Sequence, residues 1–137
     1  MHNVDGDRIG RVSMRQQGDS VRVLAKLHSL TPGFHGFHVH QTGLCEPAAA
    51  GGPFDTADGH YTGEHLKHGD HAGDMPSLLV NEDGKRGSPS SPTASALAEL
   101  RDADGSAVMV HEGRDNFANI PKRYSKTGPD KATLRHR

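Results

Sequence analysis

Apolar and polar residues alternate along several short stretches, a period of two that predicts β-strands rather than helices. In residues 21–27 the alternating apolar positions are Val21, Val23, Ala25 and Leu27. Only Leu24 breaks that pattern, and short β-rich runs follow at residues 77–81 and 107–111. The chain shows almost no helical periodicity. The pattern therefore predicts an all-β protein built as an antiparallel sandwich or barrel.

Three Asp-Gly pairs punctuate this pattern at residues 5–6, 83–84 and 104–105. Such pairs favour tight turns in which glycine takes a positive φ, and each stands next to a predicted strand. Residues 43–74 form a long loop rich in Gly, His and Asp. A loop of that length is usually functional or disordered, and its many metal-ligating side chains favour function.

Two segments depart from the strand pattern. Residues 85–95 contain two prolines and four serines, a composition that makes a poor strand and predicts a flexible loop. A short helix is expected at residues 96–101. The polar, basic segment 126–137 is expected to be a frayed or disordered tail.

Length and charge restrict the function classes. The chain has 137 residues, the size of a single domain, with 16 basic and 17 acidic residues. This balance predicts no nucleic-acid partner and no anionic-membrane partner. No apolar run approaches the ~18 residues of a membrane-spanning helix, and residues 1–6 lack the pattern of a signal peptide. Cys45 is the one cysteine, so no intrachain disulfide can form.

Histidine is the unusual residue. The chain has 11, and seven of them fall between His35 and His71. His38 and His40 are two apart on a predicted strand, so both imidazoles project from one face. The loop adds His60, His65, His68, His71 and Asp74, and His111 ends a β-rich run. Imidazole nitrogens suit copper and zinc, and nitrogen ligands with one carboxylate suit tetrahedral zinc.

Four segments together resemble the copper/zinc superoxide dismutase family. Residues 33–40 resemble the family's first copper-binding segment, and residues 110–112 its final copper-ligand segment. Residues 58–60 and 71–74 resemble the start and end of its zinc loop. Residues 115–121 with Arg123 and Tyr124 are similar to the form seen in bacterial, particularly actinobacterial, members. The four motifs occur in the family's order.

The resemblance implies a fold and a ligand set. The fold would be a Greek-key, immunoglobulin-like antiparallel barrel with a long zinc-binding loop, all in a single domain 1–137. The implied copper ligands are His38, His40, His60 and His111. The implied zinc ligands are His60, His68, His71 and Asp74. His65 is the alternative to His68, which matches the family's wording better.

The implied activity is superoxide dismutation. Copper would cycle between Cu(II) and Cu(I), oxidising one superoxide anion to O₂ and reducing the next to H₂O₂. His60 would be the catalytic group, since an imidazole shared by two cations can take up a proton and deliver it to peroxide. His35 would brace the site without binding metal. The alternative is a non-catalytic copper/zinc-binding protein of the same fold, which the same ligands would support.

Family members continue beyond the position that matches Arg137. They add an arginine near the copper, a second cysteine paired with the one matching Cys45, and a final strand. We therefore expect a barrel whose last strand is missing and whose two edges are open. The resemblance also suggests a secreted, periplasmic or cell-envelope location, and it leaves a homodimer open.

Overall fold

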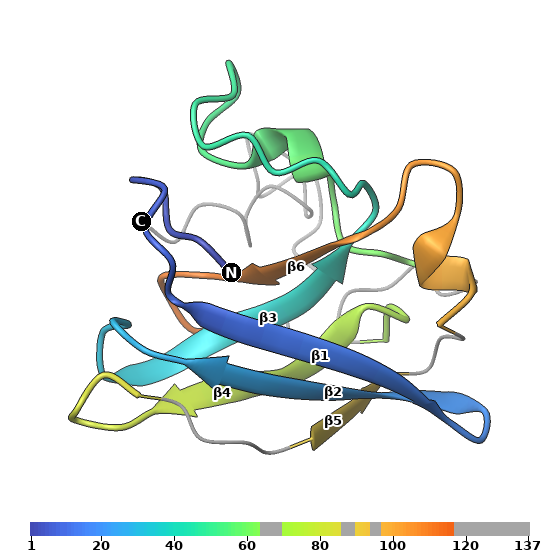
Figure 1. The fold of residues 1–137 in the computed structure, drawn as a ribbon, viewed down its shortest axis with the longest axis horizontal. Helices are drawn as coiled ribbons and strands as arrows, with labels where there is room; N and C mark the ends of the chain where they lie inside the picture. Colours follow the sequence, from blue (N-terminus) through green and yellow to red (C-terminus); the bar gives the residue numbers. More distant parts are fainter. Residues whose placement is uncertain (64–69, 86–89, 94–96, 117–137) are drawn as a thin grey trace.

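In the part of the chain that the structure describes, six strands form two antiparallel sheets that face each other (Figure 1). The computed structural model describes residues 1–63, 70–85, 90–93 and 97–116. One sheet has the order β1-β2-β5, from β1 (Gly10–Gln17), β2 (Ser20–Leu27) and β5 (Ser90–Thr93). The other has the order β4-β3-β6, from β4 (Asp74–Val80), β3 (Gly33–His40) and β6 (Ala107–Val110). The chain crosses between the sheets after β2, β4 and β5. The all-β antiparallel prediction is confirmed.

The core lies between the two sheets and follows the predicted alternation. The inward side chains are Val21, Val23, Ala25 and Leu27 from β2, Phe37 and Val39 from β3, and Met75 and Leu78 from β4. Leu100 closes one end of this cluster. Each fully buried valine, leucine or phenylalanine contributes about 1.5–3 kcal/mol of transfer free energy. Alternation thus selects the inward face of β2 and β3, while in β4 the register shift opposite Gly36 lets both Met75 and Leu78 turn inward.

The predicted turns and strands are found close to their expected positions. Gly6, Gly84 and Gly105 have φ of 85°, 70° and 66°, as the Asp-Gly pairs predict. β6 ends one residue before the predicted limit, and β4 begins three residues earlier than expected. β4 starts at Asp74 because that residue pairs with His38 of β3.

The prediction of a flexible loop throughout residues 85–95 is wrong for Ser90–Thr93, which form β5 on the free edge of β2. The register explains why a proline fits there. The His28 N–H bonds the Ile9 carbonyl, so the backbone groups of even-numbered β2 residues point toward β1. The backbone groups of odd-numbered residues such as Val21 and Val23 therefore point toward β5, where they can form the hydrogen bonds of the ladder. Pro92 lies opposite Arg22, and its nitrogen faces away from β2. The missing N–H therefore costs no ladder bond.

Helical structure in the described residues is confined to two single turns. One is the 3₁₀ turn η1 (Asp55–Ala57) in the long loop, and the other is η2 (Glu99–Arg101). η2 occupies the end of the segment expected to be helical at residues 96–101. No helix in the described part of the chain could span a membrane. The predicted tail at residues 126–137 lies outside the described residues.

Two neighbouring leucines on β4 test the assignment of the core. Leu78 is 2% exposed and Leu79 is 45% exposed, on opposite faces of the strand. We expect Leu78→Ala to lower the free energy of unfolding by about 2–5 kcal/mol, because it removes buried methyl groups and leaves a cavity. The matched change Leu79→Ala should cost less than about 1 kcal/mol. Urea unfolding of both variants measures the difference, and equal losses would contradict this packing.

Candidate metal centre

β3 is buried on both faces from His35 to His40. Phe37 and Val39 point into the core, and His38 and His40 project from the opposite face. Both histidines are 1% exposed. His38 and His40 therefore lie on one face of β3, as predicted, and the long loop covers that face.

Backbone hydrogen bonds hold the middle and the end of that loop against β3. The Val39 N–H donates to the Gly73 carbonyl at 2.9 Å, and the Tyr61 N–H donates to the Val39 carbonyl at 2.8 Å. The Gly73 N–H in turn donates to the Tyr61 carbonyl at 2.7 Å. A Cβ at Gly73 would stand 2.4 Å from the Val39 carbonyl oxygen, so only glycine allows this approach. The contact places His60 and Asp74 beside β3.

Four imidazoles converge above β3. His38, His40, His60 and His111 each offer a ring nitrogen, and these nitrogens all lie within 4.8 Å of one another. Ring centroids are 3.9 Å apart for His38 and His60 and 4.9 Å apart for His38 and His111. His60 forms an antiparallel bridge with His40, and His111 follows the end of β6. The geometry is that of a four-nitrogen metal site.

His60 also belongs to a second group, with His71 and Asp74, whose ligand atoms lie within 4.8 Å of one another. Asp74 Oδ1 accepts a hydrogen bond from His60 Nδ1 at 2.8 Å. The turn from His71 to Asp74 is closed by a bond from the Asp74 N–H to the His71 carbonyl at 3.0 Å. This group combines imidazole and carboxylate ligands, the donor set that zinc favours.

Hydrogen bonds to one ring nitrogen leave the other nitrogen available to a metal. His40 Nδ1 donates to the Asp58 carbonyl at 2.6 Å, which makes Nε2 the unprotonated nitrogen. The Nε2 atoms of His40 and His111 are buried, and no hydrogen-bond partner for either is present among the described residues. Buried polar atoms normally have partners, so a coordinated metal ion fits these positions.

Asp115 and His35 support the cluster from behind. Asp115 is buried, and its Oδ2 lies 2.5 Å from His38 Nε2, which fixes the orientation of that ring. His35 lies between two backbone carbonyl oxygens, with Nδ1 2.6 Å from that of His111 and Nε2 2.7 Å from that of Thr31. His35 thus has the bracing position expected from the sequence. The contact between Asp115 and His38 was not predicted. The one sequence signal for it is that Asp115 lies four residues after His111.

Burial makes the cluster imidazoles hard to protonate. Desolvation, followed by the repulsion of neighbouring imidazoles, lowers the pKa of His111 to about 3. Burial also lowers the pKa of His40 to about 3, against the opposing hydrogen bond to Asp58. The pKa of His38 is lowered by burial as well, although Asp115 opposes the shift. Neutral imidazoles are the form that binds metal.

The structure brings together every predicted ligand that it describes. His38, His40, His60 and His111 form one group, and His60, His71 and Asp74 form the other. His68 and its alternative His65 lie outside the described residues, so the middle zinc ligand stays a prediction.

Comparison with known proteins supports the family resemblance of the sequence. The family model for copper/zinc superoxide dismutase matches residues 8–133. A copper/zinc superoxide dismutase of Photobacterium leiognathi is 37% identical over 133 residues, covering 90% of this chain and 75% of the relative. One from Mycolicibacterium paratuberculosis is 39% identical over 116 residues, covering 77% of this chain and 51% of the relative. The chain therefore spans about half the length of that mycobacterial relative.

Solved structures show the same architecture. The copper/zinc superoxide dismutase of Brucella abortus superposes with a TM-score of 0.70 at 33% sequence identity. The superposition covers 91% of this chain and 82% of the Brucella chain.

The lowered pKa values of His40 and His111 predict acid sensitivity of the metal-free protein. Both groups titrate near 3 when folded and near 6.5 when unfolded, so below 6.5 the unfolded state binds more protons. The free energy of unfolding should therefore fall as the pH drops from 6.5 toward 3. Between about pH 7.5 and about pH 5, each histidine should contribute a loss of about 2 kcal/mol. Urea unfolding at the two pH values measures the loss. A smaller loss is expected for His111→Asn, and pH-independent stability would contradict the prediction.

Gly36 sets the spacing between two cluster histidines. A Cβ there would lie 3.1 Å from His38 Cε1 and 3.2 Å from His111 Cδ2, in a stretch where the β3 register shifts. We expect Gly36→Ala to push these rings apart and to weaken Cu(II) binding by about tenfold, with a changed copper EPR spectrum.

Gly59→Ala is the matched control, because a Cβ at Gly59 would meet no atom within 4 Å although the residue adjoins His60. Unchanged copper affinity and an unchanged spectrum in Gly36→Ala would show that Gly36 does not set this spacing.

Proposed function

The chain belongs to the copper/zinc superoxide dismutase family, and on this premise we propose that it disproportionates superoxide at the two adjoining metal sites. The observation that carries the proposal is the shared position of His60, which lies within ligand distance of both groups. A ring shared by the two groups would couple a redox metal to a second cation.

We assign copper to the four-imidazole group and zinc to the group that contains Asp74. The copper ligands are His38, His40, His60 and His111. The zinc ligands are His60, His71 and Asp74, with His68 as the expected fourth. Bound copper would supply the one-electron exchange that oxidises one superoxide anion to O₂ and reduces a second to H₂O₂. Imidazole nitrogen is a donor that suits copper, and the carboxylate of Asp74 suits zinc.

His60 is the residue best placed to handle the proton that peroxide requires. Its Nδ1 is oriented by Asp74, and its Nε2 is buried. Its ring is 5% exposed, so bulk water has little access to it. A ring held at one nitrogen can gain or lose a proton at the other without turning. This arrangement supports His60 as the proton donor to the reacting anion.

The remaining contacts keep the copper ligands in position during turnover. Asp115 holds the His38 ring at 2.5 Å, and the Asp58 carbonyl holds the His40 ring at 2.6 Å. His35 ties the backbone at His111 to Thr31. These bonds hold the rings in place and reduce the reorganisation that a change of metal charge would demand. We further propose a location outside the cytoplasm, as the resemblance suggests, and superoxide as the substrate.

Assay of the metal-loaded protein tests the function. The chain should bind one copper and one zinc and accelerate superoxide decay in pulse radiolysis. His60→Gln should lower the rate constant at least about 100-fold, because it removes the shared ring and its proton. His28→Gln is the control, since His28 is exposed and outside both groups.

Metal content is measured on each sample, so loss of copper is distinguished from loss of turnover. Tight, stoichiometric binding of both metals without superoxide decay would overturn the dismutase proposal. That result would identify the non-catalytic metal-binding alternative.

A further inference from the structure

The segment that forms β1 and β2 carries a concentration of positive charge. Residues 8–28 contain five Lys or Arg and one acidic residue, whereas the rest of the chain contains 11 Lys or Arg and 16 acidic residues. The even balance of the whole chain, which by itself predicts no anionic-membrane partner, therefore hides a separation of charge within the molecule. The charge of one face decides what that face attracts.

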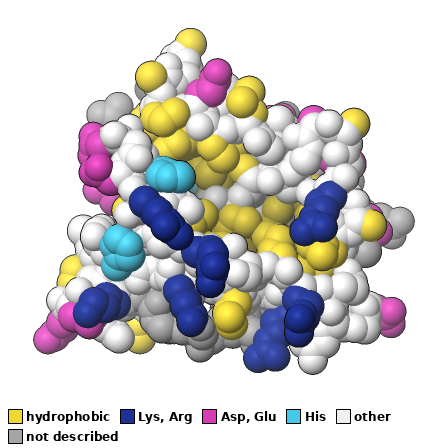
Figure 2. Space-filling model, viewed as in Figure 1, with side chains coloured by type: hydrophobic (Ala, Val, Ile, Leu, Met, Phe, Trp, Pro, Cys, Tyr) yellow, Lys and Arg dark blue, Asp and Glu magenta, His cyan; other side chains and the backbone are white. Residues whose placement is uncertain are grey.

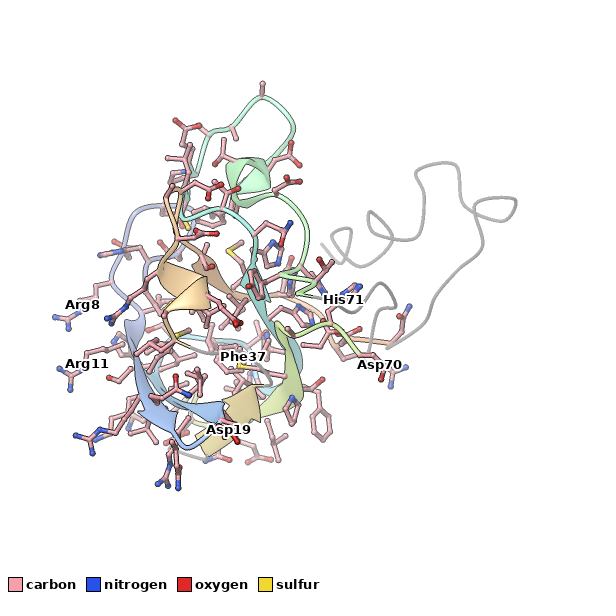
Figure 3. The ribbon with its side chains drawn as sticks, turned by 90° about the vertical axis from the view of Figure 1, so that its right-hand side faces the viewer. Arg8, Arg11, Asp19, Phe37, Asp70 and His71 are labelled. Carbon is pink, nitrogen blue, oxygen red and sulfur yellow. The ribbon has the colours of Figure 1, made fainter. Side chains whose placement is uncertain are left out.

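Strand alternation places these charges on one side. Val12 and Met14 of β1 and the odd-numbered residues of β2 pack against the core, so the intervening side chains point outward. The exposed Lys and Arg among them are Arg11 and Arg15 on β1 and Arg22 and Lys26 on β2. Arg8 precedes β1, and Figure 3 shows Arg8 and Arg11 extending outward on the same side.

The strand register sets like charges directly opposite each other. Arg11 pairs with Lys26, and Arg15 pairs with Arg22. The Cα atoms of each pair are about 5.5 Å apart, and the two pairs lie about 14 Å apart along the strands. Among the described residues, none of these four side chains forms an ion pair with an acidic group. Opposed like charges destabilise a strand pair, so an external anion would stabilise this arrangement.

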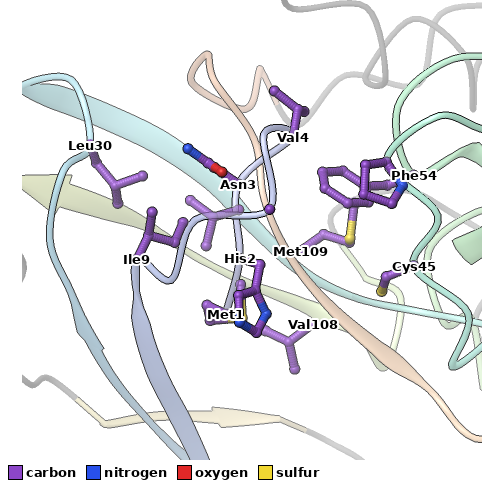
Figure 4. A pocket seen from close by; sticks show the side chains of 13 residues that line it. Met1, His2, Asn3, Val4, Ile9, Leu30, Cys45, Phe54, Val108 and Met109 are labelled. Carbon is purple, nitrogen blue, oxygen red and sulfur yellow. The ribbon is translucent and has the colours of Figure 1, made fainter.

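The positive charge is spread over a broad surface. Figure 2 shows Lys and Arg side chains distributed over the face that β1 and β2 form, with Asp and Glu side chains mainly around its edge. Ser13 and the half-buried Leu24 lie between the two charged pairs. A cavity of about 620 Å³, which Ile9 and Val108 help to line, has no Lys or Arg in its lining (Figure 4). The charge is therefore arranged for an extended partner rather than for a small anion in a pocket.

We propose that the outer face of β1 and β2 docks on a lipid bilayer that contains anionic headgroups. Four of the five cations in residues 8–28 are arginines, whose guanidinium groups form paired hydrogen bonds with phosphate oxygens. The cations of β1 and β2 lie in two parallel rows. The headgroups of a bilayer form a planar array that meets both rows together, whereas a linear polyanion presents its charges in a single row.

Docking on this face leaves the metal centre accessible. The cations lie on the outer face of the sheet β1-β2-β5, and His38 and His40 project from the outer face of the sheet β4-β3-β6. The core lies between the two sheets, so these outer faces point in opposite directions. The metal centre therefore faces away from the bilayer, on the side from which a dissolved anion arrives.

Sedimentation with lipid vesicles tests the proposal on the full, metal-loaded chain. At about 0.15 M salt, vesicles of phosphatidylcholine and phosphatidylglycerol in equal amounts should bind the chain at least about tenfold more tightly than phosphatidylcholine alone. At about 1 M salt the preference should be lost, because charges are then screened beyond about 3 Å. This readout does not depend on turnover at the metal centre.

Paired substitutions separate the effect of this face from that of net charge. Arg15→Gln combined with Arg22→Gln should lower the vesicle partition coefficient about 25-fold, since each Lys or Arg near an anionic surface contributes about fivefold. Its urea midpoint should not fall, because opposed like charges are removed. Lys85→Gln combined with Arg101→Gln is the matched control, since it removes the same charge from exposed positions outside β1 and β2. The control should change binding less than about threefold.

Fluorescent labels test the orientation on the bilayer. The variant Cys45→Ser, which removes the exposed native thiol, is the background for both labels. A label at Ser13→Cys, on the outer face of β1, should be quenched by vesicles that carry nitroxide headgroups. A label at Leu79→Cys, exposed on the outer face of β4, should not be quenched.

Four results would overturn the proposal. Equal binding to vesicles with and without phosphatidylglycerol would show that charge does not direct docking. Equal losses in the two double variants would show that net charge, and not this face, is responsible. Quenching of the Leu79 label in place of the Ser13 label would put a different face on the bilayer. Binding to soluble polyphosphate without binding to vesicles would assign the face to a linear polyanion.

Discussion

The structure depends on the burial of both faces of one strand. β3 places Phe37 and Val39 in the core and His38 and His40 under the long loop. The first face is stabilised by apolar burial, while the second consists of polar imidazoles that lose hydration. Covering the second face requires the loop to return to β3, which it does through the bonds among Val39, Tyr61 and Gly73. Packing of the core therefore holds β3 in place, and the position of β3 determines where His38 and His40 lie.

Burial of the imidazoles opposes folding and favours metal binding. A buried polar atom without a partner costs about 1–3 kcal/mol, and protonation of such a ring is opposed further by its neighbours. The Asp58 carbonyl, the carboxylate of Asp115 and the carboxylate of Asp74 each satisfy one nitrogen of a ring. These bonds select the tautomers and hold the other nitrogens at spacings that suit a metal. Metal binding then offsets the free energy that desolvation of the buried imidazoles costs on folding.

Two regions of the molecule have different physical demands. At the metal centre, polar groups are enclosed and oriented. On the outer face of β1 and β2, like charges such as those of Arg15 and Arg22 are exposed and directly opposed. Water and dissolved ions screen exposed charges, so their repulsion is tolerated there, whereas a buried charge needs a partner. The two regions can be tested separately because they share no residue.

Much of the fold and site could be predicted from the sequence, because strand alternation, Asp-Gly turns and ligand spacing are local signals. The positions of β2, β4 and β6 follow from them, as do the pairs His38–His40 and His71–Asp74. Local composition gave a wrong prediction for Ser90–Thr93, because pairing with β2 decides the conformation of this segment. The backbone nitrogen of Pro92 points away from β2, so the missing N–H removes no bond between the two strands.

By itself, the sequence determined which residue types could bind metal and which faces turn inward. The family resemblance already implied that His60 serves both groups, whereas only the tertiary structure decided that Asp115 orients His38 and that Gly36 lies against the rings of His38 and His111. The reason is distance along the chain: Asp115 and His38 are 77 residues apart, and such contacts arise from sheet pairing rather than from local pattern.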